Sequence, residues 1–176
     1  VFFGSALKIQ GIEELMDAII DLSFIQDYPE DFGARVYKIS SDDQGNRLTH
    51  VKITGGTLNA KDKVGADEKV DQIRLYNGKQ YEMVQTAYPG MICALKGLNN
   101  HEVGQGLGFE SDTTKPLLNA YMNYQLLLPE GVDALTMMRY CSVLAQEDPQ
   151  LQIEYDEQTK QIFLRLMGSI QMEILQ

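Results

Sequence analysis

The sequence is poor in the residues that build catalytic and metal sites. Its two cysteines, Cys93 and Cys141, and its two histidines, His50 and His101, stand at no metal-ligand spacing. This pattern predicts buried free thiols in a reducing compartment and argues against a structural zinc or a catalytic dyad. The phosphate-binding pattern G-x-x-x-x-G-K-[ST] is also missing from the sequence. The chain as given is therefore not expected to hydrolyse a nucleotide.

Long apolar segments are lacking too. No run approaches the ~20 apolar residues of a membrane-spanning helix, and no charged segment precedes an apolar stretch as in a signal peptide. We therefore expect a cytoplasmic protein that does not enter a membrane. The start at Val1 and the abrupt end at Gln176 lead us to expect an excised fragment, with 176 residues enough for one large or two small domains.

Positive charge is scarce and unevenly placed. The formal net charge is -10, yet eleven of the fifteen Lys and Arg residues lie between residues 32 and 116. The acidic balance argues against DNA binding and against non-specific nucleic-acid binding by the whole chain. The middle segment is the place where contact with a polyanion is expected.

The first 31 residues predict a strand followed by a helix. Residues 1–6 have the composition of a short buried strand that ends in a turn of small residues. Apolar residues then recur at helical spacing on one face, namely Ile12, Leu15, Met16, Ile19 and Ile20. A strand leading into a helix is one half of a βαβ unit, and we place the end of this segment near Asp31.

The pattern changes to alternation after residue 31. Residues 32–40 predict a strand with Ala34, Val36 and Lys38 on one face and Arg35, Tyr37 and Ile39 on the other. Turn residues at 42–46 and Asn77-Gly78 predict hairpins, and further strands are expected at 48–53, 68–76, 80–85, 91–96 and 104–109. Short strands at this spacing predict a closed antiparallel β-barrel over residues 32–116.

The last segment, residues 117–176, predicts a second fold. The expected order is a strand at 118–128, a helix at 131–147, strands at 151–155 and 161–167, and a helix from Ser169. We expect Val132, Leu135, Met138, Cys141, Ser142 and Ala145 on one face of the first helix. This order is that of a ferredoxin-like split βαβ domain without its last strand.

Two short motifs, the glycines at 104–108 and the turn at 5–7, could in principle contact a nucleotide. Gly104, Gly106 and Gly108 form G-x-G-x-G in a strand-turn context, so we interpret them as glycines at the barrel rim rather than as a dinucleotide site. The turn Ser5-Ala6-Leu7, followed by an amphipathic helix, has an ordinary structural interpretation. In this context it also resembles the fifth guanine-recognition motif of GTPases, where a backbone N–H reads the guanine carbonyl oxygen.

Three ordered blocks of the chain resemble elongation factor G and its relatives. The segments 2–7 and 11–15 resemble the end of the GTP-binding domain. Segments 36–39, 47–49, 56–58 and 62–64 resemble the second domain, a β-barrel, and segments 144–151 and 168–174 resemble the third domain. Within this superfamily, Gln171-Met172-Glu173 stands where elongation factor G usually has His-Leu-Glu. The segments 2–6 and 11–12 also look like those of the tetracycline-resistance ribosomal protection proteins, which is the branch we favour.

The resemblance implies a role on the ribosome. Such proteins bind the ribosome with GTP and Mg²⁺, and the protection branch releases tetracycline from the small subunit. The barrel resembles the part that rests on small-subunit rRNA, so we expect backbone contacts from basic residues there, the candidates being Arg47, Lys52, Lys61, Lys63 and Lys96. For the chain alone we expect no cofactor, weak salt-sensitive RNA binding, and a monomer or weak self-association.

Two alternative interpretations remain at this point. One is a housekeeping elongation factor G-like or release-factor-like GTPase, which differs from the first only in its biology. The other is a free-standing RNA- or protein-binding module made of a barrel and an α/β domain, which the unpartnered segment Val1-Phe2-Phe3 disfavours.

Overall fold

The computed structural model describes residues 1–23, 26–65, 68–110, 112–114 and 120–175. Our expected boundary at Lys115-Pro116 and the start of the strand expected at 118–128 lie outside the described residues. None of the described helices has the length and apolar character needed to cross a bilayer.

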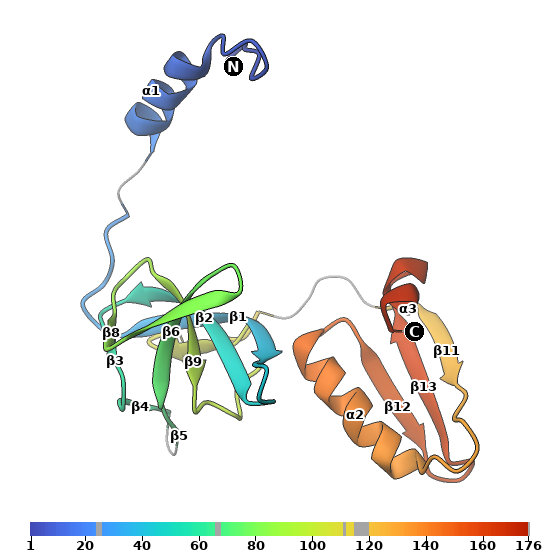
Figure 1. The fold of residues 1–176 in the computed structure, drawn as a ribbon. Coiled ribbons are helices and arrows are strands. Elements are labelled where there is room, and N and C mark those ends of the chain that lie inside the picture. The colour runs from blue at the N-terminus through green and yellow to red at the C-terminus, as the bar shows by residue number, and fades with distance from the viewer. Residues whose placement is uncertain (24–25, 66–67, 111, 115–119, 176) are drawn as a thin grey trace.

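The N-terminal segment contains the predicted helix but not the predicted strand. Helix α1 spans Ile12–Leu22, with Glu13 and Glu14 in its first turn, where the helix dipole favours acids. The expected buried strand is wrong: residues 1–4 form no ladder, and Phe3 is 89% exposed. A strand needs a neighbour to take its hydrogen bonds, and the only bridge described here joins Ser5 to Gln10. In Figure 1, α1 lies apart from both sheets, and none of its residues is buried.

The middle part of the chain forms a six-stranded antiparallel sheet in the order β10-β1-β2-β9-β6-β7. Its strands are β1 (Gly33–Ser41), β2 (Arg47–Gly55), β6 (Gln72–Asn77), β7 (Gln80–Val84), β9 (Ile92–Lys96) and β10 (Gly106–Gly108). Short ladders join β3 (Leu58–Asn59) to β8 (Thr86–Ala87) and β4 (Lys63–Val64) to β5 (Glu68–Lys69). We call residues 32–114 that carry these strands the central β-domain.

The antiparallel, mostly β character of this domain confirms the predicted fold class. The predicted barrel is not closed by strand pairing, because among the described residues the outer strands β7 and β10 do not pair with each other. The second predicted hairpin forms one residue later than expected: Asn77 pairs with Gln80, so the two-residue loop is Gly78-Lys79, with Gly78 at a φ of 63°.

A β-bulge corrects the predicted alternation of β1. The register with β2 shifts between Val36 and Lys38, so two residues of β1 occupy the space of one. Ala34 and Val36 face the core as expected, but after the bulge Ile39 is buried and Lys38 is exposed. The bulge therefore turns both Tyr37 and Lys38 toward solvent.

One apolar core lies between the sheet and the short ladders. It contains Val51, Ile53, Ile73, Leu95 and Leu98, each 0% exposed, together with nine further buried residues. Strands β2 and β9 each contribute every second residue to this core, as the pleat requires, namely Val51 and Ile53, and Cys93 and Leu95. Thr49 is also fully buried, and its hydroxyl donates to the Leu98 carbonyl oxygen at 3.0 Å, which removes the cost of an unpaired polar group.

Glycines close the domain at its last strand. Gly104 (φ 90°) and Gly108 (φ 68°) adopt left-handed backbone angles, and a Cβ on either would stand 2.0 Å from a backbone oxygen, of Thr114 and Phe32 respectively. These contacts let the chain fold back on itself beside β1. The interpretation of the G-x-G-x-G segment as rim glycines agrees with this geometry.

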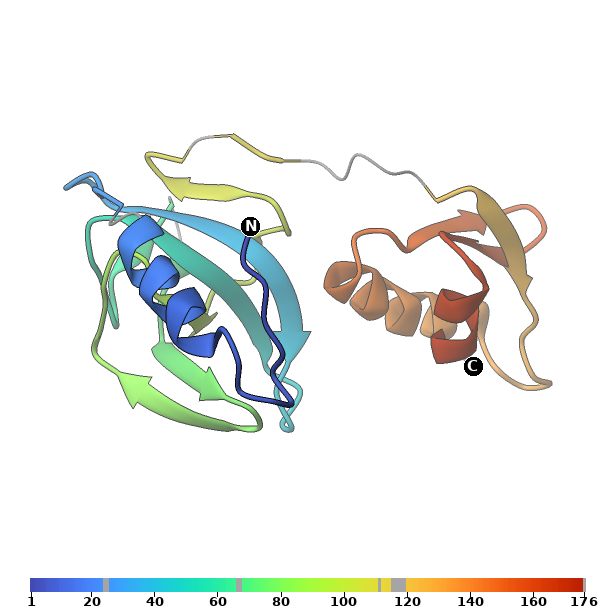
Figure 2. The same cartoon turned by 90° about the horizontal axis from the view of Figure 1, so that it is seen from above.

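The C-terminal part is a three-stranded antiparallel sheet in the order β11-β13-β12 with two helices on one face (Figure 2). Its elements are β11 (Met122–Leu126), α2 (Ala134–Glu147), β12 (Gln152–Asp156), β13 (Gln161–Leu166) and α3 (Ser169–Leu175). Strand β13 lies between β11 and β12, which is the split βαβ arrangement predicted from the sequence.

Helix α2 begins three residues later than predicted. Residues 129–132 form a turn, in which the Val132 N–H donates to the Pro129 carbonyl oxygen at 3.2 Å. The Asp133 carboxylate then accepts from the Thr136 N–H at 2.9 Å and caps the helix. On the expected inner face, Cys141 is buried, while Leu135 is 58% exposed.

Candidate functional site

The five basic residues predicted to contact RNA do not form one cluster. Lys52 and Lys96 lie on β2 and β9 of the large sheet, while Lys61 and Lys63 lie at the β4–β5 end of the domain. Lys61 is 3.4 Å from the Asp71 carboxylate, so part of its charge is already balanced. Lys52 and Lys63 are exposed, and within the described ranges no acidic side chain forms an ion pair with them.

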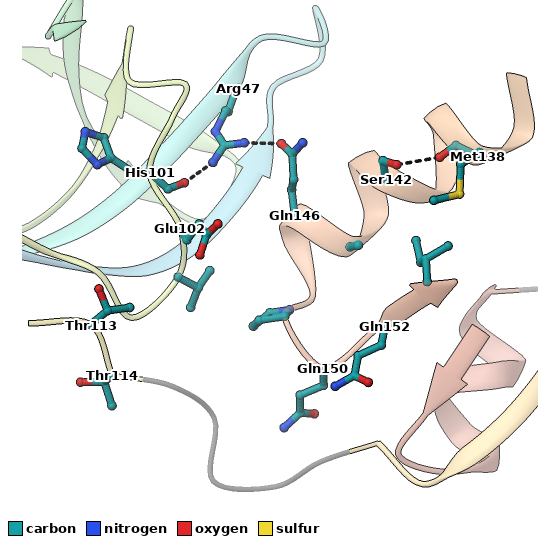
Figure 3. A pocket seen from close by; sticks show the side chains of 14 residues that line it. Arg47, His101, Glu102, Thr113, Thr114, Met138, Ser142, Gln146, Gln150 and Gln152 are labelled. Atoms are coloured by element: carbon teal, nitrogen blue, oxygen red, sulfur yellow. Dashed lines mark hydrogen bonds between the residues drawn. The ribbon is translucent and has the colours of Figure 1, made fainter. Parts of the chain in front are cut away.

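Arg47 points away from the others, into a cleft between the central β-domain and the C-terminal part (Figure 3). Its guanidinium donates to the Gln146 side chain of α2 and to the His101 carbonyl oxygen. Next to it, the Ser41 hydroxyl donates to Glu147 at 2.9 Å. Arg47 thus joins the two parts of the chain, a contact that the sequence alone did not indicate.

The cleft itself has a volume of about 610 Å³. Val103, Thr113 and Thr114 line it from the central β-domain, and Met138, Ser142 and Gln150 from the C-terminal part (Figure 3). His101, only 9% exposed, also lines the cleft, and its Nε2 is 3.1 Å from the Glu68 carboxylate. No group of three or more metal-binding side chains gathers here or elsewhere in the described part of the chain.

The solvent-facing side of the large sheet is basic, although the chain is acidic. The four strands β1, β2, β6 and β9 contain no Asp or Glu but carry six cations, namely Arg35, Lys38, Arg47, Lys52, Arg74 and Lys96. We call the surface made by the outward residues of β1, β2, β9, β6 and β7 the outward face. Arg47 is turned toward the cleft, so the cations of the outward face are Arg35, Lys38, Lys52, Arg74 and Lys96.

Two of the cations on these strands are held by carboxylates. Arg74 is 4% exposed, and its Nη1 lies 3.1 Å from Asp42 of the β1–β2 turn, while Gln72 accepts from its Nε and Nη2. Partial burial opposes ionisation of Asp42, but hydrogen bonds from Asn46, Arg74 and the Gln44 N–H outweigh it and lower the Asp42 pKa to about 2.

Arg35 is held in the same way at the edge of the sheet. It donates to Glu110, to Asp112 at 2.7 Å, to Thr114 at 3.0 Å and to the Gly104 carbonyl oxygen at 3.3 Å. These bonds tie the segment after β10 to β1, and those to Asp112 and Glu110 raise the Arg35 pKa. Sequence reasoning missed both arginine networks, because their carboxylate partners lie 32 to 77 residues away in the chain.

The predicted guanine-reading turn forms a compact loop. The Ser5 N–H donates to the Gln10 carbonyl oxygen at 3.0 Å, and the Ser5 carbonyl oxygen accepts from Lys8 and Gln10. The backbone N–H groups of Ala6 and Leu7 have no hydrogen-bond partner within the described part of the chain. The role of Ser5, Ala6 and Leu7 in nucleotide recognition stays a prediction.

The fold and the sequence together define the class of protein. Residues 31–108 match the family described as elongation factor G domain 2, and residues 130–176 match elongation factor G, domain III. The chain therefore belongs to the elongation factor G family, of which it carries the second and third domains.

Individual relatives cover nearly the whole chain. A tetracycline resistance protein, TetP, from Clostridium perfringens is 32% identical over 99% of this chain. Elongation factor G from Neorickettsia sennetsu is 26% identical and elongation factor G 2 from Syntrophus aciditrophicus 25% identical, each over 99% of the chain. The chain spans only 28% of the length of TetP and 30% of the length of the two elongation factors.

A solved structure shares the fold. A crystal structure of a protein from Thermus thermophilus superimposes with a TM-score of 0.72 over 93% of this chain, at 18% sequence identity, and the chain covers 27% of that structure.

Proposed function

We propose that this chain is the ribosome-binding middle part of a translational GTPase. The observation that carries the proposal is the pair of family matches in the order domain II then domain III, combined with a basic outward face on an acidic chain. We propose the domain boundaries 1–31, 32–116 and 117–176. The parent would bind GTP and Mg²⁺ through a domain of which residues 1–31, including the turn Ser5-Ala6-Leu7, are the end. The chain alone would not be an enzyme.

Within this class we favour the ribosomal protection branch. TetP is 32% identical to the chain, whereas the two elongation factors are 25% and 26% identical. A parent of this branch would release tetracycline from the small subunit. Expression of the full-length gene in a tetracycline-susceptible host should raise the inhibitory concentration of tetracycline. Unchanged susceptibility would instead favour a housekeeping elongation or release factor.

The partner proposed for the central β-domain is small-subunit rRNA. Arg47 and Lys61 already have protein partners, so Lys52, Lys63 and Lys96 are the better placed of the five candidates for contact with phosphates. Lysines that contact phosphates release counterions, so binding should weaken steeply as salt is raised.

Removal of two outward lysines tests this role directly. Lys52→Gln with Lys96→Gln should weaken binding of the chain to isolated small ribosomal subunits about tenfold and reduce the salt slope by about 2, because each phosphate contact contributes about 1. Sedimentation with the subunits over a salt series measures both. A matched control changes the exposed Lys8 and Lys160 to Gln. Equal weakening by both pairs would show only a general charge effect and would contradict the assignment.

A further inference from the structure

Four rings form a row across the outward face of the large sheet. Tyr37 of β1 meets His50 of β2 with ring centroids 6.0 Å apart, and His50 meets Tyr76 of β6 at 6.1 Å. Tyr76 in turn meets Tyr81 of β7 at 5.3 Å. We call these four residues the aromatic row.

The row crosses a strand that contributes no ring. Strand β9 lies between β2 and β6, and its Ala94 pairs with both His50 and Arg74. Two strand spacings separate β2 from β6 by ~9.6 Å, and the small, buried Ala94 side chain leaves room above β9 for the rings of His50 and Tyr76. The guanidinium carbon of Arg74 lies 4.4 Å from the centre of the Tyr81 ring and supports the end of the row from below.

The rings are accessible although they contact one another. Tyr37 and Tyr81 are each 46% exposed and Tyr76 is 38% exposed. If the row served only to stabilise the pairing of strands, burial of the rings would be expected, because cross-strand aromatic pairs stabilise a sheet through packing. Here the planes of neighbouring rings are inclined to each other by 41° to 63°.

The surroundings of the row are basic. Lys38 pairs directly with His50 across the β1–β2 ladder, and Lys52 follows His50 by two residues on the same face. The charge of Arg74 is balanced by Asp42, and Glu82 of β7 pairs with Leu75, out of phase with Tyr81. Two exposed lysines therefore flank the rings, with no carboxylate on the four strands β1, β2, β6 and β9.

We propose that the aromatic row is a stacking platform for unpaired nucleotides of RNA. Every base has a π-face, so tyrosine rings stack bases with little regard to sequence, and adjacent lysines take the phosphates. A paired helix keeps its bases stacked inside and offers mainly its backbone, so single-stranded loops or bulges fit this face better than duplex. This inference rests on the proposed function, which supplies ribosomal RNA as the polymer.

The experiment compares three labelled probes with the 176-residue chain. They are an oligouridylate of about twelve nucleotides, the duplex of this strand with oligoadenylate, and an abasic strand of the same length, which keeps the phosphates and lacks the bases. The chain should bind the single strand more tightly than either of the other probes. Fluorescence anisotropy at low salt gives the three dissociation constants.

Ring variants then separate stacking from structure. Tyr76→Leu with Tyr81→Leu should weaken binding of the single strand at least about fivefold and leave binding of the abasic strand unchanged. Tyr76→Phe with Tyr81→Phe keeps the rings and should bind as the original chain does. Tyr121 and Tyr140, which are 77% and 66% exposed outside the central β-domain, provide the matched pair of leucine variants, with no expected effect.

Sedimentation with small ribosomal subunits distinguishes failure of the proposed function from failure of the stacking platform. If the original chain does not bind subunits at all, the proposed function fails. If the original chain binds subunits and the lysine variants weaken this binding, the proposed function stands. If Tyr76→Leu with Tyr81→Leu then binds the single strand as the original chain does, the stacking platform is overturned. A leucine pair that weakens subunit binding without affecting the oligonucleotide would mean that the face contacts ribosomal protein, which also overturns the inference.

Discussion

Replacing Leu95 with alanine should lower the free energy of unfolding of the central β-domain by about 3 kcal/mol. Leu95 is 0% exposed in β9, the strand that joins β2 to β6, and it is part of the main apolar core. The substitution removes three buried carbons and leaves a cavity that paired strands on both sides cannot fill. Urea denaturation followed by tyrosine fluorescence and circular dichroism measures the loss.

The same strand provides the control. Ile92 is 59% exposed, so Ile92→Ala should change the free energy of unfolding by less than about 0.5 kcal/mol. If Leu95→Ala were as mild as Ile92→Ala, the core described here could not be the one that stabilises the domain in solution.

Replacing Arg74 with methionine should destabilise the central β-domain by about 3 kcal/mol, because breaking a buried pair leaves a charge without its partner. The Arg74 and Asp42 side chains are 5% and 11% exposed, and their contact links the β1–β2 turn to β6 across the face of the sheet. Methionine keeps much of the volume, so the loss reports the charge and its hydrogen bonds rather than a cavity. Thermal and urea unfolding measure it, and the control for loss of a positive charge is Lys79→Met in the exposed β6–β7 loop.

The pH dependence of the free energy of unfolding gives a second measure of the contact between Arg74 and Asp42. The Asp42 pKa is lowered from 3.8 to about 2 in the folded chain, so its contribution to stability is present above pH 4 and is lost as the pH falls toward 2. Arg74→Met removes one of the hydrogen bonds that favour the carboxylate, so its pKa should return toward the ordinary value. The variant should then lose less stability than the original chain between pH 4 and pH 2. An equal loss in both chains would mean that Arg74 does not stabilise the Asp42 carboxylate.

Local patterns in the sequence were sufficient for most of the secondary structure. The stripe in α1, the turn residues at 42–46 and the order of the last five elements each depend on near neighbours in the chain, and the structure confirms them. The bulge at Val36–Lys38 could not be predicted in this way, because it depends on how β1 registers with β2. It exchanged the expected sides of Lys38 and Ile39.

The candidate site was less accessible to sequence reasoning than the fold. Counting charges located the basic segment, but it could not show that Arg47 turns toward α2 or that Lys61 lies beside Asp71. The aromatic row draws one residue from each of four strands, and Tyr37 and Tyr81 are 44 positions apart in the printed sequence. Only the strand order β1-β2-β9-β6-β7 brings these rings together.

The residues around Ala94 give strand β9 a different role on each of its two faces. Its neighbours Cys93 and Leu95 face the core, where burial raises the pKa of the Cys93 thiol to about 12. The small Ala94 side chain faces the opposite side, where it leaves room for His50 and Tyr76 to approach each other. A valine or isoleucine at this position would suit a strand well, yet its extra bulk would push the two rings apart. A homologue could therefore lose a continuous ring surface through a substitution that preserves or even improves its stability. Size at this single position would be a more sensitive guide to an intact aromatic row than overall sequence similarity.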